Sequence, residues 1–225
     1  MQIKREKTNR KVSREINAAR AGDAIGTLWT GCEIYGLSKG QFSLVEIIEH
    51  CLNQTGPAHV TISTWTAAGA DLTHTNNLLH SGSVLSAKWL VDTSFPSRQP
   101  GYCKILEELF GTESIVVTKN HCKFVLLRNE NWNLVIRTSM NLNLNNRLEN
   151  FEISDDKQMA EMLETLYQGI KAEGLTLAAR KKKGVSFSNK GLNSVLGPLE
   201  AIPQEVAYNA EAGISSHGSS RVSYD

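Results

Sequence analysis

Long apolar runs are missing from this 225-residue sequence, and the longest reach only a few residues, as in Phe124–Leu127. A transmembrane helix needs about 20 apolar residues, so none is expected. The basic N-terminus has no apolar core behind it, which argues against a secretory signal. The four cysteines include no Cys-x-x-Cys pair, which excludes a zinc ribbon and a thioredoxin-type motif. We therefore expect a cytoplasmic protein with reduced thiols and no membrane partner.

Neither sign of charge is in large excess, because 24 Lys or Arg face 23 Asp or Glu. Hydrophobic residues make up 40% and charged residues 21%, which excludes disordered, collagen-like and fibrous chains. The charges are nevertheless uneven. Residues 1–20 carry seven basic and two acidic groups, residues 180–183 are Arg-Lys-Lys-Lys, and residues 21–179 hold eleven basic and seventeen acidic groups. Basic flanks around an acidic core suit polyanion binding, or else are solvated arms without a partner.

Hydrophobic periodicity predicts an alternation of helices and strands. Ser43 and Glu46 form a capping-box pattern at the start of a helix over residues 42–53, and Pro57 follows that helix. Further helices are expected near 72–80, over 102–110 and over 155–173. Strands are expected over the following ranges: 58–65, 84–95, 114–118, 121–127 and 133–141. Residues 96–101 read as a loop.

This order predicts an α/β fold, with a mixed β-sheet flanked by helices on both faces. At 100–200 residues per domain, we expect one domain over residues 23–179. A basic N-terminal arm over 1–22 precedes it. A basic linker and low-complexity tail over 180–225 follows, which we expect to be largely disordered apart from a short helix near 192–199.

Chemistry-bearing side chains gather in one predicted hairpin. If side chains alternate along a strand, His121 and Lys123 share one face while Cys122 points into packing. Ser139, Asn141 and Asn143 share one face of the next strand, opposite Met140 and Leu142. An imidazole, an ammonium, a hydroxyl and two amides then converge, which suits the binding and cleavage of a phosphodiester.

These residues resemble the signature of the phospholipase D superfamily, which is His-x-Lys, a downstream Asp, and Gly-Ser-x-Asn on the following strand. His121-x-Lys123 and the run Thr138–Asn143 match its two halves, and Glu149 lies where the family often has a Glu. The resemblance covers roughly residues 55–175. The sequence departs from the pattern in three ways: Arg128 stands where the family has Asp, Thr138 replaces the glycine, and the connection is three residues longer.

The resemblance implies a metal-independent mechanism without a cofactor. In the family two signatures face each other, one histidine forming a phosphohistidine and the other protonating the leaving group. Only one His-x-Lys is present here, so a homodimer would be required. By this resemblance His121, Lys123, Ser139, Asn141 and Glu149 are the candidate catalytic residues, with Glu149 holding the histidine in its tautomer.

Four further residues are candidates for substrate binding. They are Asn143 beside the serine motif, the basic residues Lys119 and Arg128, and Trp132 in the turn, where an aromatic ring can stack on a base. The absence of the family Asp at Arg128 removes an acidic partner expected to help order the site. His59, His74 and His80 are interpreted as structural or surface residues, and Trp65 and Trp89 as core.

A single signature, a short chain and basic flanks are most similar to the nuclease branch of the family. The leading hypothesis is an endonuclease-like phosphodiesterase, a homodimeric hydrolase acting on DNA. The chain also resembles proteins from phage and mobile-element gene sets. The alternative is a catalytically inactive DNA-binding or assembly component with the same fold. A lipid-hydrolysing or phosphatidyl-transferring enzyme is a third hypothesis, but no strongly apolar amphipathic anchor supports it.

Overall fold

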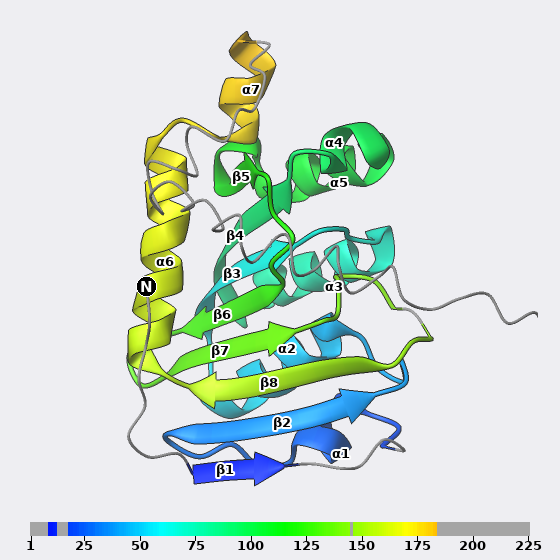
Figure 1. Ribbon diagram of the computed structural model, residues 1–225, viewed down its shortest axis with the longest axis vertical. Helices are drawn as coiled ribbons and strands as arrows, with labels where there is room; N and C mark the ends of the chain where they lie inside the picture. Colours follow the sequence, from blue (N-terminus) through cyan, green and yellow to red (C-terminus); the bar gives the residue numbers. More distant parts are fainter. Residues whose placement is uncertain (1–8, 13–17, 145, 184–225) are drawn as a thin grey trace, which may run out of the picture.

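The computed structural model describes residues 9–12, 18–144 and 146–183. It contains an eight-stranded mixed sheet in the order β1-β2-β8-β7-β6-β3-β4-β5 (Figure 1). The strands are β1 Asn9–Val12, β2 Cys32–Ser38, β3 Ala58–Thr64, β4 Val84–Asp92, β5 Ile115–Thr118, β6 Phe124–Arg128, β7 Asn133–Thr138 and β8 Glu149–Asp155. The helices are α1 Ala21–Ile25, α2 Leu44–Thr55, α3 Gly69–His80, α4 Phe95–Arg98, α5 Pro100–Phe110, α6 Lys157–Ala172 and α7 Leu177–Lys183, with a 3₁₀ turn at Thr112–Ser114.

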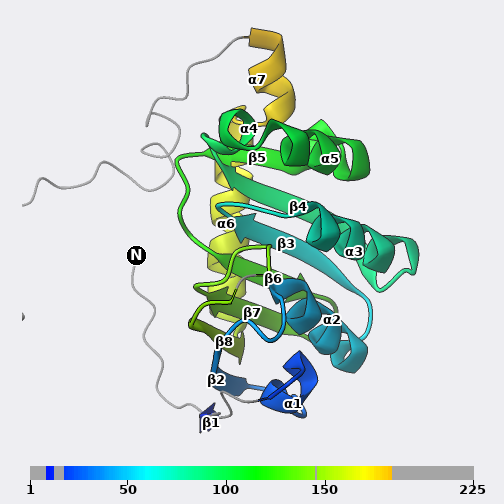
Figure 2. The same ribbon diagram turned by 90° about the vertical axis from the view of Figure 1, so that its right-hand side faces the viewer.

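Helices cover both faces of the sheet, as the sequence predicts. Helices α1, α2, α3 and α5 lie on one face and α6 lies on the other (Figure 2). The α6 side buries Tyr167 and Ile170 against strand residues such as Leu126 and Val135. The other face holds the larger apolar core, with Trp89 and many aliphatic side chains fully buried. Both faces of the central strands are thus removed from water, which explains their short continuous apolar runs.

Helix α2 forms where its capping pattern predicts. The Ser43 hydroxyl accepts a hydrogen bond from the Glu46 amide, and the Glu46 carboxylate accepts one from the Ser43 amide, which completes the capping box. Gly56, at φ 80°, ends the helix in a conformation that favours glycine, ahead of Pro57. This helix buries its apolar face, including Leu44 and Ile48, against the sheet.

Other boundaries differ from the sequence prediction. The predicted loop 96–101 is largely helical, because α4 and α5 each carry a proline in their first turn, where the missing N–H costs nothing. The strands β2 and β8 were not predicted, although their buried and less buried residues alternate over much of their length. Part of the predicted arm, Asn9–Val12, pairs in parallel with β2. The predicted tail helix 192–199 lies outside the described residues.

Candidate functional site

The strand directions bring most of the predicted site residues to one edge of the sheet. Strands β3, β4, β5 and β7 run the same way, and β6 and β8 run antiparallel to their neighbours. The carboxyl ends of the first group and the amino ends of β6 and β8 therefore share one edge (Figure 1), which we call the carboxyl edge. His121 and Lys123 precede β6, Ser139 follows β7, and Glu149 begins β8. Open edges of this kind are common ligand sites in α/β sheets.

His121 and Lys123 lie in a loop ahead of β6, and not in the strand itself. Strand β6 begins at Phe124, three residues later than predicted, and Cys122, which was predicted to be buried, is exposed. The cause is Asn120, whose buried side chain accepts a hydrogen bond from the Cys122 amide at 3.0 Å and donates to the Ser63 hydroxyl at 3.0 Å. Such side-chain bonds compete with the sheet ladder. They hold His121 at the surface beside the sheet.

Asp92 and Ser63 complete the support for this loop. The backbone N–H of Asn120 donates to the Asp92 carboxylate at 3.0 Å, and the Ser63 hydroxyl donates to the Cys122 carbonyl at 2.9 Å. Burial opposes ionisation of Asp92, but hydrogen bonds from Ser94 and Asn120 outweigh it and lower the pKa of this carboxyl. Asp92 is therefore a fixed negative acceptor beneath the loop. The Lys123 ammonium donates to the His121 carbonyl at 3.2 Å.

Ser139 lies next to this loop across the sheet. The Thr138 amide donates to the Lys123 carbonyl at 3.3 Å, which extends the β6–β7 ladder by one bond. The exposed Ser139 hydroxyl donates to the Glu149 carboxylate and accepts from the backbone N–H of Asn150 at 3.0 Å. Glu149 is thus bonded to the serine. Its predicted bond to His121 is not among the contacts of the described residues and stays a prediction.

Beyond β7 the chain crosses the end of β6. Strand β6 lies between β3 and β7, yet the Leu142 amide donates to the Thr66 carbonyl at 3.2 Å, and the Ala68 amide donates to the Leu142 carbonyl at 2.7 Å. We call residues 139–143 the crossover segment. Met140 and Leu142 point into the core, so the predicted alternation holds although β7 ends at Thr138.

The crossover segment presents two partly buried amides. The side-chain oxygens of Asn141 and Asn143 are buried without a hydrogen-bond partner among the described residues. Most buried polar atoms in proteins have a hydrogen-bond partner. Both unpartnered atoms are acceptors, which a ligand satisfies only by donating a hydrogen bond, whereas an anion would contact the N–H groups of the same side chains.

Two residues that the sequence prediction did not place at the site, Trp65 and Arg98, complete this edge. The Trp65 ring, directly after β3, lies 5.9 Å from the His121 ring, centroid to centroid. The exposed Arg98 guanidinium lies 3.6 Å from the centre of the Trp65 ring and donates to the Trp65 carbonyl at 2.8 Å. Lys119 is exposed directly after β5. Trp65 could have been placed at the site from its position at the end of a predicted strand. Nothing in the sequence singled out Arg98, which lay in a predicted loop.

Arg128 and Trp132 lie at the opposite edge. Arg128 ends β6, five residues beyond Lys123, which is about 17 Å at 3.3 Å per residue. Trp132 is in the β6–β7 turn and packs partly against the core. One phosphate therefore cannot contact His121 and Arg128 of the same chain. An Asp at position 128 would lie at this opposite edge, so its absence removes no acidic partner from the carboxyl edge, contrary to the sequence interpretation.

In the described ranges, no group of three or more His, Cys, Asp or Glu side chains is arranged to hold a metal ion. None of the helices in those ranges combines the length and apolarity needed to cross a membrane.

Comparison with known proteins gives structural likeness without sequence likeness. No family model and no curated protein matches the sequence. A polyphosphate kinase structure from Porphyromonas gingivalis aligns with 62% of the chain at 10% identity and a TM-score of 0.47. A phosphatidylserine synthase structure from Haemophilus influenzae aligns with 64% at 17% identity and a TM-score of 0.43. The aligned parts are 26% and 38% of those chains, so this chain spans well under half the length of either protein.

Proposed function

We propose that the chain is a metal-independent phosphodiesterase of the phospholipase D type that cleaves DNA as a homodimer. One observation supports this above all. His121 and Lys123 lie at the carboxyl edge together with Ser139 and with Asn141 and Asn143 of the crossover segment. These groups come from both halves of the signature that the sequence resembles, and the strand directions gather them at one surface.

The residues divide the chemistry between them. The Lys123 ammonium and the Asn141 side-chain N–H groups donate to the non-bridging oxygens of the scissile phosphate, and the Ser139 hydroxyl does so once it turns from the Glu149 carboxylate. These donors stabilise the charge that develops in the transition state. An imidazole nitrogen of His121 attacks phosphorus and forms an N–P bond as the bond to the leaving oxygen breaks. The partner subunit's His121 gives its proton to that oxygen. It then accepts a proton from the water that hydrolyses the N–P bond.

The requirement for two subunits follows from the count of histidine motifs. The sequence has one His-x-Lys, and one histidine cannot be bonded to phosphorus and protonate the leaving group together. A twofold axis beside the carboxyl edge supplies the second imidazole. Light scattering at micromolar concentration should therefore give a mass of about twice 24.8 kDa, and a monomer that cleaves DNA would rule out this mechanism.

DNA is the favoured substrate because the edge is cationic and aromatic. Arg98 lies over the Trp65 ring, Lys123 donates to the His121 carbonyl, and the exposed Lys119 follows β5 at the same edge. Cations bind the phosphate backbone and release counterions, and an aromatic ring can stack on an unpaired base. Binding should therefore weaken steeply with added salt.

A catalytically inactive DNA-binding component is the second candidate. The observation that favours it is the pairing of Glu149 with Ser139, which leaves His121 without a carboxylate partner among the described residues. An imidazole without an orienting partner is a weaker nucleophile. The same cationic edge would then bind DNA without turnover.

Cleavage of DNA in the presence of EDTA separates the two candidates. We would compare wild type with His121→Ala on supercoiled and single-stranded DNA at low salt. His80→Ala is the matched control, because His80 is an exposed histidine on α3, away from the site. Cleavage by wild type and His80→Ala but not by His121→Ala supports the enzyme. Retention of DNA in a gel without cleavage by any variant supports the binding component, and neither cleavage nor binding overturns both.

A further inference from the structure

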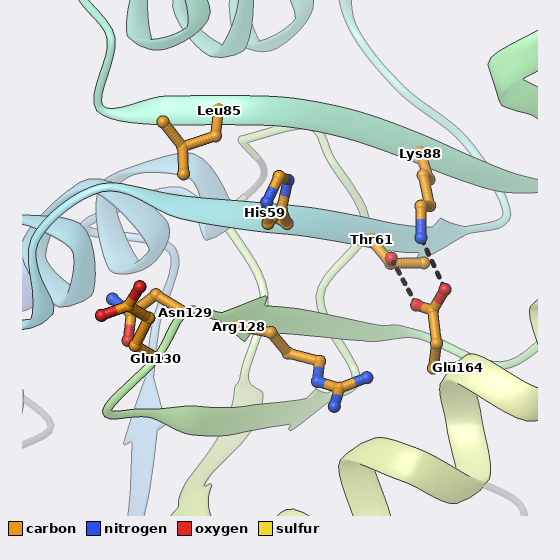
Figure 3. A pocket seen from close by; sticks show the side chains of 8 residues that line it. All are labelled: His59, Thr61, Leu85, Lys88, Arg128, Asn129, Glu130 and Glu164. Atoms are coloured by element: carbon orange, nitrogen blue, oxygen red, sulfur yellow. Dashed lines mark hydrogen bonds and ion pairs between the residues drawn. The ribbon is translucent and has the colours of Figure 1, made fainter.

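A pocket lies at the opposite edge of the sheet from His121. It has a volume of about 510 Å³, and it opens on the face that α6 covers (Figure 3). Its lining comes from β3, β4, β6, the turn after β6, and α6: His59, Thr61, Leu85, Lys88, Arg128, Asn129, Glu130 and Glu164. Small-molecule sites commonly measure about 300–1,000 Å³, so this volume suits a small ligand.

A row of polar side chains runs across four strands at this pocket. Arg128 is paired with His59 on β3 and with Asn133 on β7, and His59 is paired with Ser86 on β4. The Arg128 Nε donates to Asn133 Oδ1 at 3.2 Å, and His59 Nδ1 is 2.8 Å from the Ser86 hydroxyl. The bonds to Asn133 and Ser86 fix the Arg128 and His59 side chains. Among the described residues, the terminal nitrogens of Arg128 and the Nε2 of His59 have no hydrogen-bond partner, so they remain for a ligand.

Arg128 is the cation in this pocket that lacks a carboxylate partner among the described residues. Lys88 pairs with Glu164 at 2.5 Å, and the same carboxylate accepts from Thr61 and Gln168. Burial opposes ionisation of Glu164, but the hydrogen bonds from Lys88 and Gln168 outweigh it and lower its pKa. Glu130 is exposed on the turn, at the end of the pocket away from Thr61 (Figure 3).

We propose that this pocket binds a small molecule through a phosphate group held between Arg128 and His59. Directly opposite residues on one face of a sheet have Cβ atoms about 4.5–5.5 Å apart. Arg128 leans toward Asn133 and His59 leans toward Ser86, so the phosphate would lie in the space between the guanidinium and the ring (Figure 3). A guanidinium binds phosphate through two parallel hydrogen bonds, and the imidazole adds a third donor. The exposed side chain of Leu85 forms an apolar wall for the rest of the ligand.

This site is independent of the proposed cleavage site and uses a residue that departs from the family pattern. Arg128 takes the position of the family Asp, at the far end of β6 from Lys123. One cationic group thus lies just before β6 and another at its last residue, each at a different edge. Ligand at one edge cannot bridge to the other, since about 17 Å of strand separates them.

Histidine ring NMR signals of the full-length protein test the proposal. We would titrate inorganic phosphate, adenosine 5′-monophosphate and adenosine, with the His59 signal assigned from a His59→Gln variant. We expect saturable shifts of the His59 signal with phosphate and with the nucleotide, tighter for the nucleotide, and none with adenosine. Arg128→Met should weaken both at least about tenfold, as expected for the loss of charge-assisted bonds. Lys104→Met, which removes an exposed cation on α5, should change neither by more than about twofold.

Several outcomes would overturn the proposal. These are phosphate-induced shifts confined to His121, equal binding by Arg128→Met, and equal binding of adenosine. If Arg128→Met fails to fold, Arg128→Lys replaces it. The lysine keeps the charge but lacks the planar fork, so affinity should fall several-fold, and unchanged affinity would count against the site.

Discussion

Replacement of Asn120 by Ala is the sharpest test of how the His121 loop is held. The side chain has two N–H donors, with three acceptors in range on Ser63, Leu90 and Cys122, and its oxygen accepts from the Cys122 amide. Two donated bonds and one accepted bond are lost in the variant. At about 0.5–1.5 kcal/mol each, the loss of stability is about 2–4 kcal/mol. For a chain of this size that corresponds to a fall in Tm of roughly 4–16 °C.

The assay is thermal unfolding followed by circular dichroism, combined with DNA cleavage below the lower Tm. Asn77→Ala is the control, since Asn77 is exposed on α3, and substitutions of that kind change stability by less than about 0.5 kcal/mol. Ser63→Ala should give an intermediate fall, because Ser63 bonds to both Asn120 and the Cys122 carbonyl. A Tm for Asn120→Ala within 2 °C of wild type would refute the reasoning that Asn120 carries this loop.

Three further predictions rest on other parts of the fold. Gly36→Ala should destabilise the protein by roughly 1–3 kcal/mol in urea unfolding, since the added Cβ would lie 2.2 Å from the Phe151 ring; unchanged stability would contradict the tight packing. Burial raises the pKa of the Cys51 thiol, so iodoacetamide should alkylate exposed Cys122 in the native protein and Cys51 only after unfolding, as mass spectrometry can show. Because the folded pKa of Glu164 lies below its unfolded value, its ionised form stabilises the fold above an unfolded pKa of about 4.3. That contribution is lost as pH falls through the folded value. The stability advantage of wild type over Glu164→Gln should therefore shrink below about pH 4, and an advantage independent of pH would refute the pairing.

Local sequence patterns were sufficient to predict the helices and strands whose ends and buried faces depend on nearby residues. The capping box of α2 is written in Ser43 and Glu46, and α6 follows from its apolar stripe. The mixed sheet with helices on both faces follows from the alternation of these elements. The grouping of His121 and Lys123 with Ser139 follows from adjacent strands, and the structure places them at one edge as an antiparallel hairpin requires.

What the sequence could not predict depends on contacts between distant segments. Trp65 approaches His121 only because β3 pairs with β6, and Arg98 arrives through a helix predicted as loop. The predicted strand included His121, but the Cys122 amide is bonded to the Asn120 side chain and not to a neighbouring strand, so β6 begins later. The separation of Arg128 from the site, by contrast, follows from the rise along β6 and could have been worked out from the predicted strand.

The crossover segment also has a consequence for the order of folding. Its bonds to residues 66 and 68 span the end of β6, so they can close only after β3, β6 and β7 have paired. Pairing between strands that are distant in sequence, such as β3 and β6, is slow relative to the formation of a local hairpin. The Leu142 amide, although it lies outside every strand, should therefore become protected from hydrogen exchange after the amides of the β6–β7 hairpin. The asparagines of the site would then reach their positions in the last stage of folding.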